Sequence, residues 1–365
     1  MINPYKGVDW GKVKHVHSAS HMHHDMLVKY MQDDGYEHVA ISNYYPSRPI
    51  LDYETIVDPA WGDSIDTLPQ GMVGSPNAEH HNSIVGNRRN SDFHFNGLGS
   101  TWESGKGRYE EPVGVYDKTW QTAFNLILAE LKVPDGGGIT INHPNWYSNE
   151  KNKLTQDQIE QFLQYDSRVL GVEIFNAPVE EKLGWAIDVW DNLLKKGIRA
   201  WGFCVTDHPN PRPCQGRNVL LVDRDKFAAE ANSVETRGVG AECLKAYREG
   251  RFYGKIFNTP LQFEEIKFED NIFTVKTNNA TKIIVVVDGV PEEFNSKEIS
   301  YAVPKGATYV RAQACTDTPY DYVYTNPIML DPQEDPPVNP PIEPPTPSPD
   351  EPELKKISFS KMMWY

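Results

Sequence analysis

Residues 120–143 read W-Q-T-A-F-N-L-I-L-A-E-L-K-V-P-D-G-G-G-I-T-I-N-H, and they are the clearest sign of an α/β pattern in the chain. Apolar side chains recur in its first half at helical spacing, at Trp120, Ala123, Phe124, Ile127, Leu128 and Leu131. This spacing predicts an amphipathic helix. Three consecutive glycines end the helix, and Ile139–Asn142 then predicts a short buried strand.

The same alternation continues on both sides of this stretch. Helical spacing recurs near 155–164, 183–194 and 240–250. Apolar runs of strand length occur at 13–17, 38–42, 169–175, 200–206 and 219–222. Strands that alternate with helices of about 10–15 residues form βα units on a parallel sheet. Because there are about six or seven such units, we expect a closed TIM-like barrel rather than an open sheet.

The sequence pattern changes after Pro260. Alternating runs joined by turn-type dipeptides predict a small antiparallel β-sandwich that ends near Leu330. Between Pro332 and Pro352, 10 of 21 residues are proline and every charge is acidic, which predicts an extended linker. We therefore expect three parts, which are a barrel over residues 1–257, a β-sandwich domain over 258–330, and a linker with a short tail over 331–365. The tail is too short to fold alone and could contact another chain or domain.

Composition excludes several classes of protein. The chain has 365 residues, with 36 Lys and Arg against 51 Asp and Glu, and a net charge of −15 opposes binding to a nucleic-acid backbone. No apolar run approaches the ~18–20 residues of a membrane span, and the N-terminus lacks the apolar stretch of a secretory signal. Four cysteines without a C-x-x-C pair indicate neither a thiolate zinc site nor a disulfide framework. We expect a cytoplasmic protein with no membrane or nucleic-acid partner.

Histidines are concentrated near the N-terminus, where five of the 11 lie between His15 and His24. His15 and His17 are two residues apart on a predicted strand, so their side chains project to one face. Two imidazoles at the mouth of a barrel can begin a metal site. The alternative is a pair of surface histidines in a polar turn.

Other residues of metal-ligand type follow predicted strands or lie in adjoining loops: Glu79, His94, His143, Asp207 and His208. Each one alone is more often a solvated or capping side chain. Together, at one end of successive βα units, they indicate the active site of a barrel. Residues 44–115 show little periodicity, which is typical of functional loops.

This order of residues, H-x-H, a later Glu, a His, His-Pro after a strand and Asp-His after another, resembles the polymerase and histidinol phosphatase (PHP) superfamily. The resemblance covers about residues 12–255. It implies a distorted (β/α)7 barrel that holds two or three divalent metal ions, commonly zinc, manganese or iron, and it implies phosphoester hydrolysis.

By this resemblance, His15 and His17 would bind the first metal and His23 a third one. Glu79 would bridge two metals, His94 and His143 would bind the second, and Asp207 and His208 would complete the site. His21 and His24 lie close enough to His23 to leave the register open. Two features depart from the family pattern: Asp207 and His208 are adjacent rather than separated by one residue, and Asn43-Tyr44 replaces an Asp-His pair.

A mixed site of imidazoles and carboxylates suits Zn²⁺, Mn²⁺ or Fe²⁺. Two such ions ~3.5–4 Å apart would activate a shared water and polarise a phosphoryl oxygen. Loop arginines, Arg48 and Arg88 foremost, could hold the phosphate. With Glu79 and Asp207 they form the expected catalytic set of a phosphoesterase that acts on a small-molecule ester. The alternatives are a hydrolase of carboxylic or carbamic esters, and a non-catalytic binding protein on a degenerate barrel, which Tyr44 and the proline-rich segment favour.

Overall fold

The computed structural model describes most of the chain, and every structural statement below concerns the described residues. They are 1–23, 32–42, 56–57, 65–66, 68–80, 84–85, 88–89, 93–102, 119–147, 153–177, 183–208, 216–257 and 259–340. Five helices lie within them: α2 (Trp120–Ala129), α3 (Gln156–Leu163), α4 (Ile187–Lys195), α5 (Arg224–Ala231) and α6 (Ala241–Glu249).

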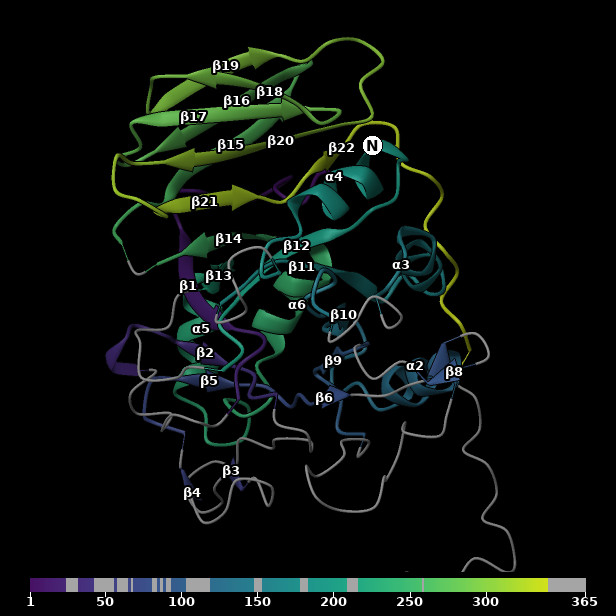
Figure 1. Cartoon of the computed structure of the whole chain (residues 1–365). Helices are drawn as coiled ribbons and strands as arrows, with labels where there is room; N and C mark the ends of the chain where they lie inside the picture. The colour runs from purple at the N-terminus through teal and green to yellow at the C-terminus, as the bar shows by residue number, and fades with distance from the viewer. Residues whose placement is uncertain are drawn as a thin grey trace, which may run out of the picture.

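The largest sheet has ten strands and crosses the molecule from the C-terminal part to the N-terminal strands (Figure 1). In spatial order they are β18 (Val290–Phe294), β17 (Lys282–Val287), β20 (Tyr309–Cys315), β21 (Tyr322–Thr325), β14 (Phe252–Ile256), β13 (Gly216–Asp223), β1 (Val13–Ala19), β2 (His38–Val39) and β5 (Val73–Gly74), with β22 (Ile328–Met329) on β20. This sheet runs through the expected boundary at residue 257, because β14 pairs with β21 and places Tyr253 opposite Thr325.

A second sheet carries the strands that helices α2, α3 and α4 cover. Its order is β12 (Trp201–Val205), β11 (Val169–Asn176), β10 (Gly138–Ile141), β9 (Phe95–Leu98) and β6 (Glu79–His80). Three smaller groups complete the described strands: β15 (Phe263–Glu269) with β16 (Ile272–Thr277) and β19 (Glu298–Ala302), β3 (Ile56–Val57) with β4 (Ile65–Asp66), and β7 (Ile84–Val85) with β8 (Arg88–Arg89).

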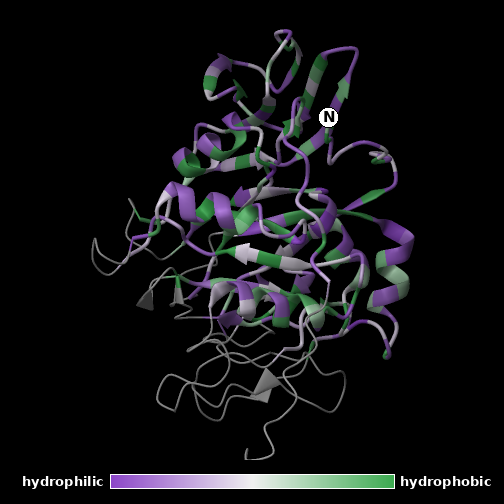
Figure 2. Cartoon of the chain, turned by 90° about the vertical axis from the view of Figure 1, so that its right-hand side faces the viewer, coloured by the Kyte–Doolittle hydropathy of each residue, from purple (hydrophilic) through white to green (hydrophobic). Residues whose placement is uncertain are grey.

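The helix and strand predicted over residues 120–142 are confirmed as α2 and β10. Thr119 caps α2 by accepting a hydrogen bond from the Thr122 amide. The apolar face of α2 is buried against β9 and α3, where the Phe124 ring lies 5.1 Å from Phe95 and the Trp120 ring lies 4.8 Å from Phe162. Figure 2 shows hydrophobic and hydrophilic residues interspersed along the helical ribbons.

The predicted (β/α)7 barrel is wrong. The described strands form separate sheets, and β1 with β13, β13 with β14, and β9 with β10 all pair antiparallel. Parallel pairing is confined to β1–β2–β5 and β10–β11–β12 among the described strands. An apolar run predicts a buried strand but not its direction. Two helices in succession, α5 and α6, connect β13 to an antiparallel neighbour, which no regular βα repeat would do.

The C-terminal strands are joined to the α/β part by a buried ion pair. The Arg311 guanidinium on β20 donates to both carboxylate oxygens of Asp191 on α4, each at 2.8 Å. The Tyr309 hydroxyl donates to the same carboxylate at 2.8 Å. Because the guanidinium is almost fully buried, loss of Asp191 would leave an uncompensated charge.

The first residues of the proline-rich segment dock onto the α3–α4 surface rather than extend away from it (Figure 1). The Gln333 amide donates to the Gly197 carbonyl at 2.8 Å, Arg199 pairs with Asp335 at 3.0 Å, and the Asn339 amide donates to Asp166 at 2.7 Å. Residues 341–365 lie outside the described part. No described helix combines the length and the apolar character that crossing a bilayer requires.

Candidate metal centre

The centre forms where the chain leaves β1 and meets the end of β12. Beyond Ala19, Met22 makes a parallel bridge with Asp207. The His23 amide donates to the Asp207 carbonyl at 2.8 Å, and the Asp207 amide donates to the His21 carbonyl at 3.0 Å. These main-chain bonds hold the ends of the two large sheets together and bring both histidines beside Asp207.

The first group of metal-ligating atoms comes from His21, His23, Glu79 and Asp207, all buried. The His21 Nε2 atom lies 3.5 Å from a Glu79 oxygen and 3.3 Å from Asp207 Oδ1, and His23 Nε2 lies 3.0 and 3.2 Å from oxygens of the same two carboxylates. Ligands at ~2.1 Å from a tetrahedral ion are ~3.4 Å apart. Among the described residues, His21 Nε2 and Asp207 Oδ1 have no hydrogen-bond partner. The donor set therefore fits a metal ion.

The second group consists of Glu79, His94 and His143. Glu79 Oε1 lies 3.1 Å from His94 Nδ1 and 3.4 Å from His143 Nε2, and the two imidazole rings meet edge to face at 4.9 Å. Glu79 belongs to both groups and lies on the short strand β6. A carboxylate between two groups of ligands has the geometry of a bridge between two metal positions.

The pKa values of these groups show how strongly the cavity favours positive charge. Burial lowers the pKa of His21, but Asp207, Glu173 and Glu79 outweigh it and leave the pKa well above 6.5. Burial also lowers the pKa of His23, but Asp207 and Glu79 outweigh it and raise this pKa to about 9. Burial raises the pKa of Asp207, yet His21 and His23 hold it well below its usual value. A divalent cation can replace the protons that this cavity otherwise retains.

Asparagine and glutamate side chains behind the ligands orient them. Asn142 donates to Glu79 Oε1 at 3.1 Å, and Asn176 donates to Asp207 Oδ2 at 3.1 Å. Glu173 accepts from His21 Nδ1 at 2.6 Å. Glu173 is not among the site residues predicted from sequence, although a lone carboxylate in the apolar run L-G-V-E-I-F-N is a signal for it.

Two of the ligands have a strained main chain. His143 has φ 24° and Asp207 has φ 59°, values that residues other than glycine rarely adopt. Such conformations cost on the order of 1–3 kcal/mol and persist where the surrounding structure requires them. Both residues follow the ends of strands, β10 and β12, so the reversed main chain turns each side chain back into the centre.

The structure brings together five of the eight predicted metal ligands, His23, Glu79, His94, His143 and Asp207. His208 lies beside them. Its ring stacks on His23 at 4.1 Å, and its Nε2 is 3.6 Å from Asp207 Oδ1. His21, which the sequence analysis left open in register, is a full member of the first group.

His15 and His17, the predicted pair for the first metal, belong to neither group. His15 Nδ1 lies 3.1 Å from the Tyr253 hydroxyl, and His17 Nδ1 lies 3.5 Å from the Arg217 guanidinium. Burial, reinforced by neighbouring cations, lowers their pKa values to about 4 and about 3. The physical reason is that β1 continues to Ala19, so the residues that follow its end are His21-Met22-His23 instead.

The cationic side chains expected around a phosphate are not assembled by the described residues. The described part does not include Arg48 or the side chain of Arg88. It also does not include His24, Asn43 and Tyr44. Arg217, which the sequence predicts to be a loop arginine, is instead buried on β13 and paired with Asp34 at 2.8 Å.

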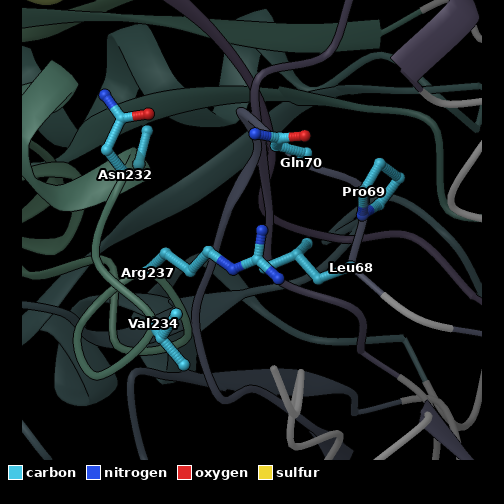
Figure 3. Close-up of a pocket in the computed structure, with 7 residues that line it drawn as sticks. Leu68, Pro69, Gln70, Asn232, Val234 and Arg237 are labelled. Atoms are coloured by element: carbon cyan, nitrogen blue, oxygen red, sulfur yellow. The ribbon is translucent and has the colours of Figure 1, made fainter. Parts of the chain in front are cut away.

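A separate pocket of about 390 Å³ lies between the end of α5 and the residues that precede β5. Its walls are Leu68, Pro69, Gln70, Ala231, Asn232, Val234 and Arg237. Figure 3 shows the Arg237 guanidinium extending across it toward Leu68. None of these residues belongs to either group of metal ligands.

No family model, curated protein or solved structure matches the chain. Functional inference therefore starts from the buried cluster. The structure shows that this His/Glu/Asp cluster can hold a metal ion.

Proposed function

We propose that the protein is a metal-dependent phosphoesterase whose two metal positions share Glu79. The observation that carries the proposal is the position of this carboxylate. Its Oε1 faces His94 and His143 of the second group and also lies 3.5 Å from His21 Nε2 of the first, and its Oε2 faces His23. Hydrolases that bind two metals use such a bridge to hold both ions at one reacting centre.

The order of the ligands supports a relationship to the PHP superfamily as part of this proposal. With His21 and His23 in place of His15 and His17, the chain still presents H-x-H, Glu, His, His-Pro and Asp-His in that order. The fold contributes no support, because the barrel that the family implies was not found.

Charge favours an anionic substrate. Among the described ligands, only Glu79 and Asp207 are carboxylates, and the others are imidazoles. Two divalent ions would therefore leave the centre positive within a chain of net charge −15. A phosphoester carries the complementary charge, whereas a neutral ester does not.

The bound ions would lower the pKa of a water molecule and polarise the phosphoryl oxygen. The chain's own groups would orient this chemistry. Asn142 and Asn176 hold Glu79 and Asp207 in position. His208, with a third of its side chain exposed beside Asp207, lies where it could give a proton to the leaving alkoxide.

The test is a substrate panel of phosphomonoesters, phosphodiesters, and carboxylic and carbamic esters. Each substrate is offered to metal-depleted protein and to protein reloaded with Zn²⁺, Mn²⁺ or Fe²⁺. We expect turnover of phosphoesters only after reloading. Turnover of only the carboxylic or carbamic esters would support the metal site but assign the protein to a different class of substrate. Equal turnover by the metal-depleted protein would refute the proposal.

A further inference from the structure

We infer that Glu173 is a positioning residue that sets the tautomer of His21 and so creates the first metal position. The inference rests on the proposed two-metal function. Glu173 lies on β11 with 1% of its surface exposed, and it is absent from both groups of metal-ligating atoms. It therefore acts on the metal only through other residues.

The contact with His21 determines which ring nitrogen faces the centre. Glu173 Oε1 lies 2.6 Å from His21 Nδ1. A carboxylate can only accept, so Nδ1 carries the hydrogen. A neutral imidazole has one N–H, which leaves the lone pair of Nε2 directed at the carboxylate oxygens of Glu79 and Asp207, 3.5 and 3.3 Å away. That is the tautomer a metal ligand needs at Nε2.

The other oxygen of Glu173 holds the second group. Oε2 accepts from the His143 main-chain amide at 2.8 Å and from Asn176 Nδ2 at 2.9 Å. The same Asn176 amide donates to Asp207 Oδ2 at 3.1 Å. One buried carboxylate thus reaches ligands of both metal positions, and it supports the strained main chain of His143.

The variant Glu173→Gln separates positioning from simple filling of the core, because it keeps the shape but has only one acceptor oxygen. The His143 amide and Asn176 both donate on one side of the side chain, and only His21 Nδ1 donates on the other. The single acceptor oxygen is therefore expected to stay with the His143 amide and Asn176. In this orientation the new NH₂ group faces His21 Nδ1, and Nδ1 must then accept a hydrogen bond from it. The His21 hydrogen moves to Nε2, where it points at the first metal position and blocks it. The ligands His94 and His143 keep their nitrogens free.

The test is a titration of metal-depleted protein with Co²⁺, followed by calorimetry and by the visible absorption of the bound ion. Wild type is expected to bind two equivalents. Glu173→Gln is expected to bind one equivalent normally and the other ~10–100-fold more weakly. Asp166→Asn is the matched control, since Asp166 is equally buried but contacts Arg168 and Asn339 instead of the centre. It should bind as wild type does.

Glu173→Gln with both affinities within twofold of wild type would overturn this inference alone. Wild type that binds no Co²⁺ would overturn the proposed function together with it. A second measurement does not depend on the Glu173 variant: ¹⁵N-histidine NMR of the Zn²⁺-loaded wild type, with the His21 signals assigned by their absence in His21→Gln. We expect a hydrogen on Nδ1 and a metal-bound Nε2. A hydrogen on Nε2 would contradict the inference.

Discussion

Asp207 and His21 are joined through their main chains, with the Asp207 amide donating to the His21 carbonyl at 3.0 Å. This bond ties the end of β12 to the segment after β1, two regions far apart in the chain. Because Asp207 has φ 59°, its side chain turns back toward the imidazole of the residue that its amide contacts. The metal centre is therefore a property of the tertiary structure and not of any single segment.

The register of the histidine pair can be tested with four matched variants. His21→Gln and His23→Gln should each lose about one equivalent of bound metal, because each removes a buried ligand of the first group. His15→Gln and His17→Gln should keep the wild-type metal content, because their rings contact Tyr253 and Arg217. The measurement is metal content after gel filtration. If only the His15 and His17 variants lost metal, the first metal would be bound by His15 and His17, as the sequence predicts.

Glu79→Gln should weaken both metal positions at once. The amide has one acceptor oxygen and no charge, so it cannot bridge two cations as a carboxylate can. We expect loss of metal and at least ~10²-fold lower turnover of a phosphomonoester. Glu37→Gln is the control, because the Glu37 side chain pairs with Lys14 at 2.6 Å and belongs to neither group of metal ligands. Near-normal turnover by Glu79→Gln would exclude the bridge.

Folding stability should depend on pH through His38. This fully buried ring lies 2.6 Å from Ser18 Oγ and 2.8 Å from Ser75 Oγ, and burial lowers its pKa to about 3. In the unfolded chain His38 binds a proton as the pH falls through about 6.5, whereas in the folded protein it stays neutral until the pH approaches 3. Its contribution to the free energy of unfolding is therefore fully present above pH 6.5 and is lost as the pH falls toward 3. Between pH 7 and pH 5 the loss from this group is about 2 kcal/mol.

The difference in unfolding free energy between wild type and His38→Gln isolates this contribution. Urea titrations at the two pH values should show the wild-type advantage shrinking as pH falls. Tyr247→Phe removes a hydroxyl that contacts Ser18 at 2.6 Å in the same network, and burial raises the pKa of that tyrosine. Its effect on stability should be the same at both pH values. A wild-type advantage that is constant from pH 7 to pH 5 would show that His38 does not stay neutral.

The docked proline-rich segment should contribute a small, measurable stability. Arg199 is nearly buried, and its partner Asp335 is about half exposed, with 3.0 Å between them. Asp335→Asn should lower the free energy of unfolding by about 1 kcal/mol, because solvent screens the pair on one side. Glu334→Gln, at the neighbouring exposed position, should change nothing measurable. Equal effects of the two substitutions would indicate general charge repulsion instead of the Arg199 contact.

Elements with a strong local pattern could be predicted from sequence. Helix α2 and strand β10 follow directly from the apolar spacing and from the three glycines, of which the third begins β10. The direction of the strands could not be predicted. The antiparallel partner of β10 is β9, and its residues Phe95–Leu98 show no helical or alternating signal of their own. Direction depends on contacts between distant residues, which a single sequence does not display.

The candidate site was predictable in its residue types and not in its register. His143 and Asp207 each follow the end of a predicted strand and are predicted from that signal, whereas Glu79 lies in a stretch with little periodicity and is predicted from the family resemblance. His15 and His17 also have the right spacing, and only the length of β1 excludes them from the centre. Glu173 was missed because its role depends on three partners brought together by folding.

If the described cluster holds two metal ions around Glu79, the purified protein must contain them, and its metal content can be measured. Plasma emission analysis of mildly purified wild-type protein should give about two equivalents of zinc, manganese or iron per chain. Fewer than one equivalent, with no gain after incubation with these metals, would contradict the account.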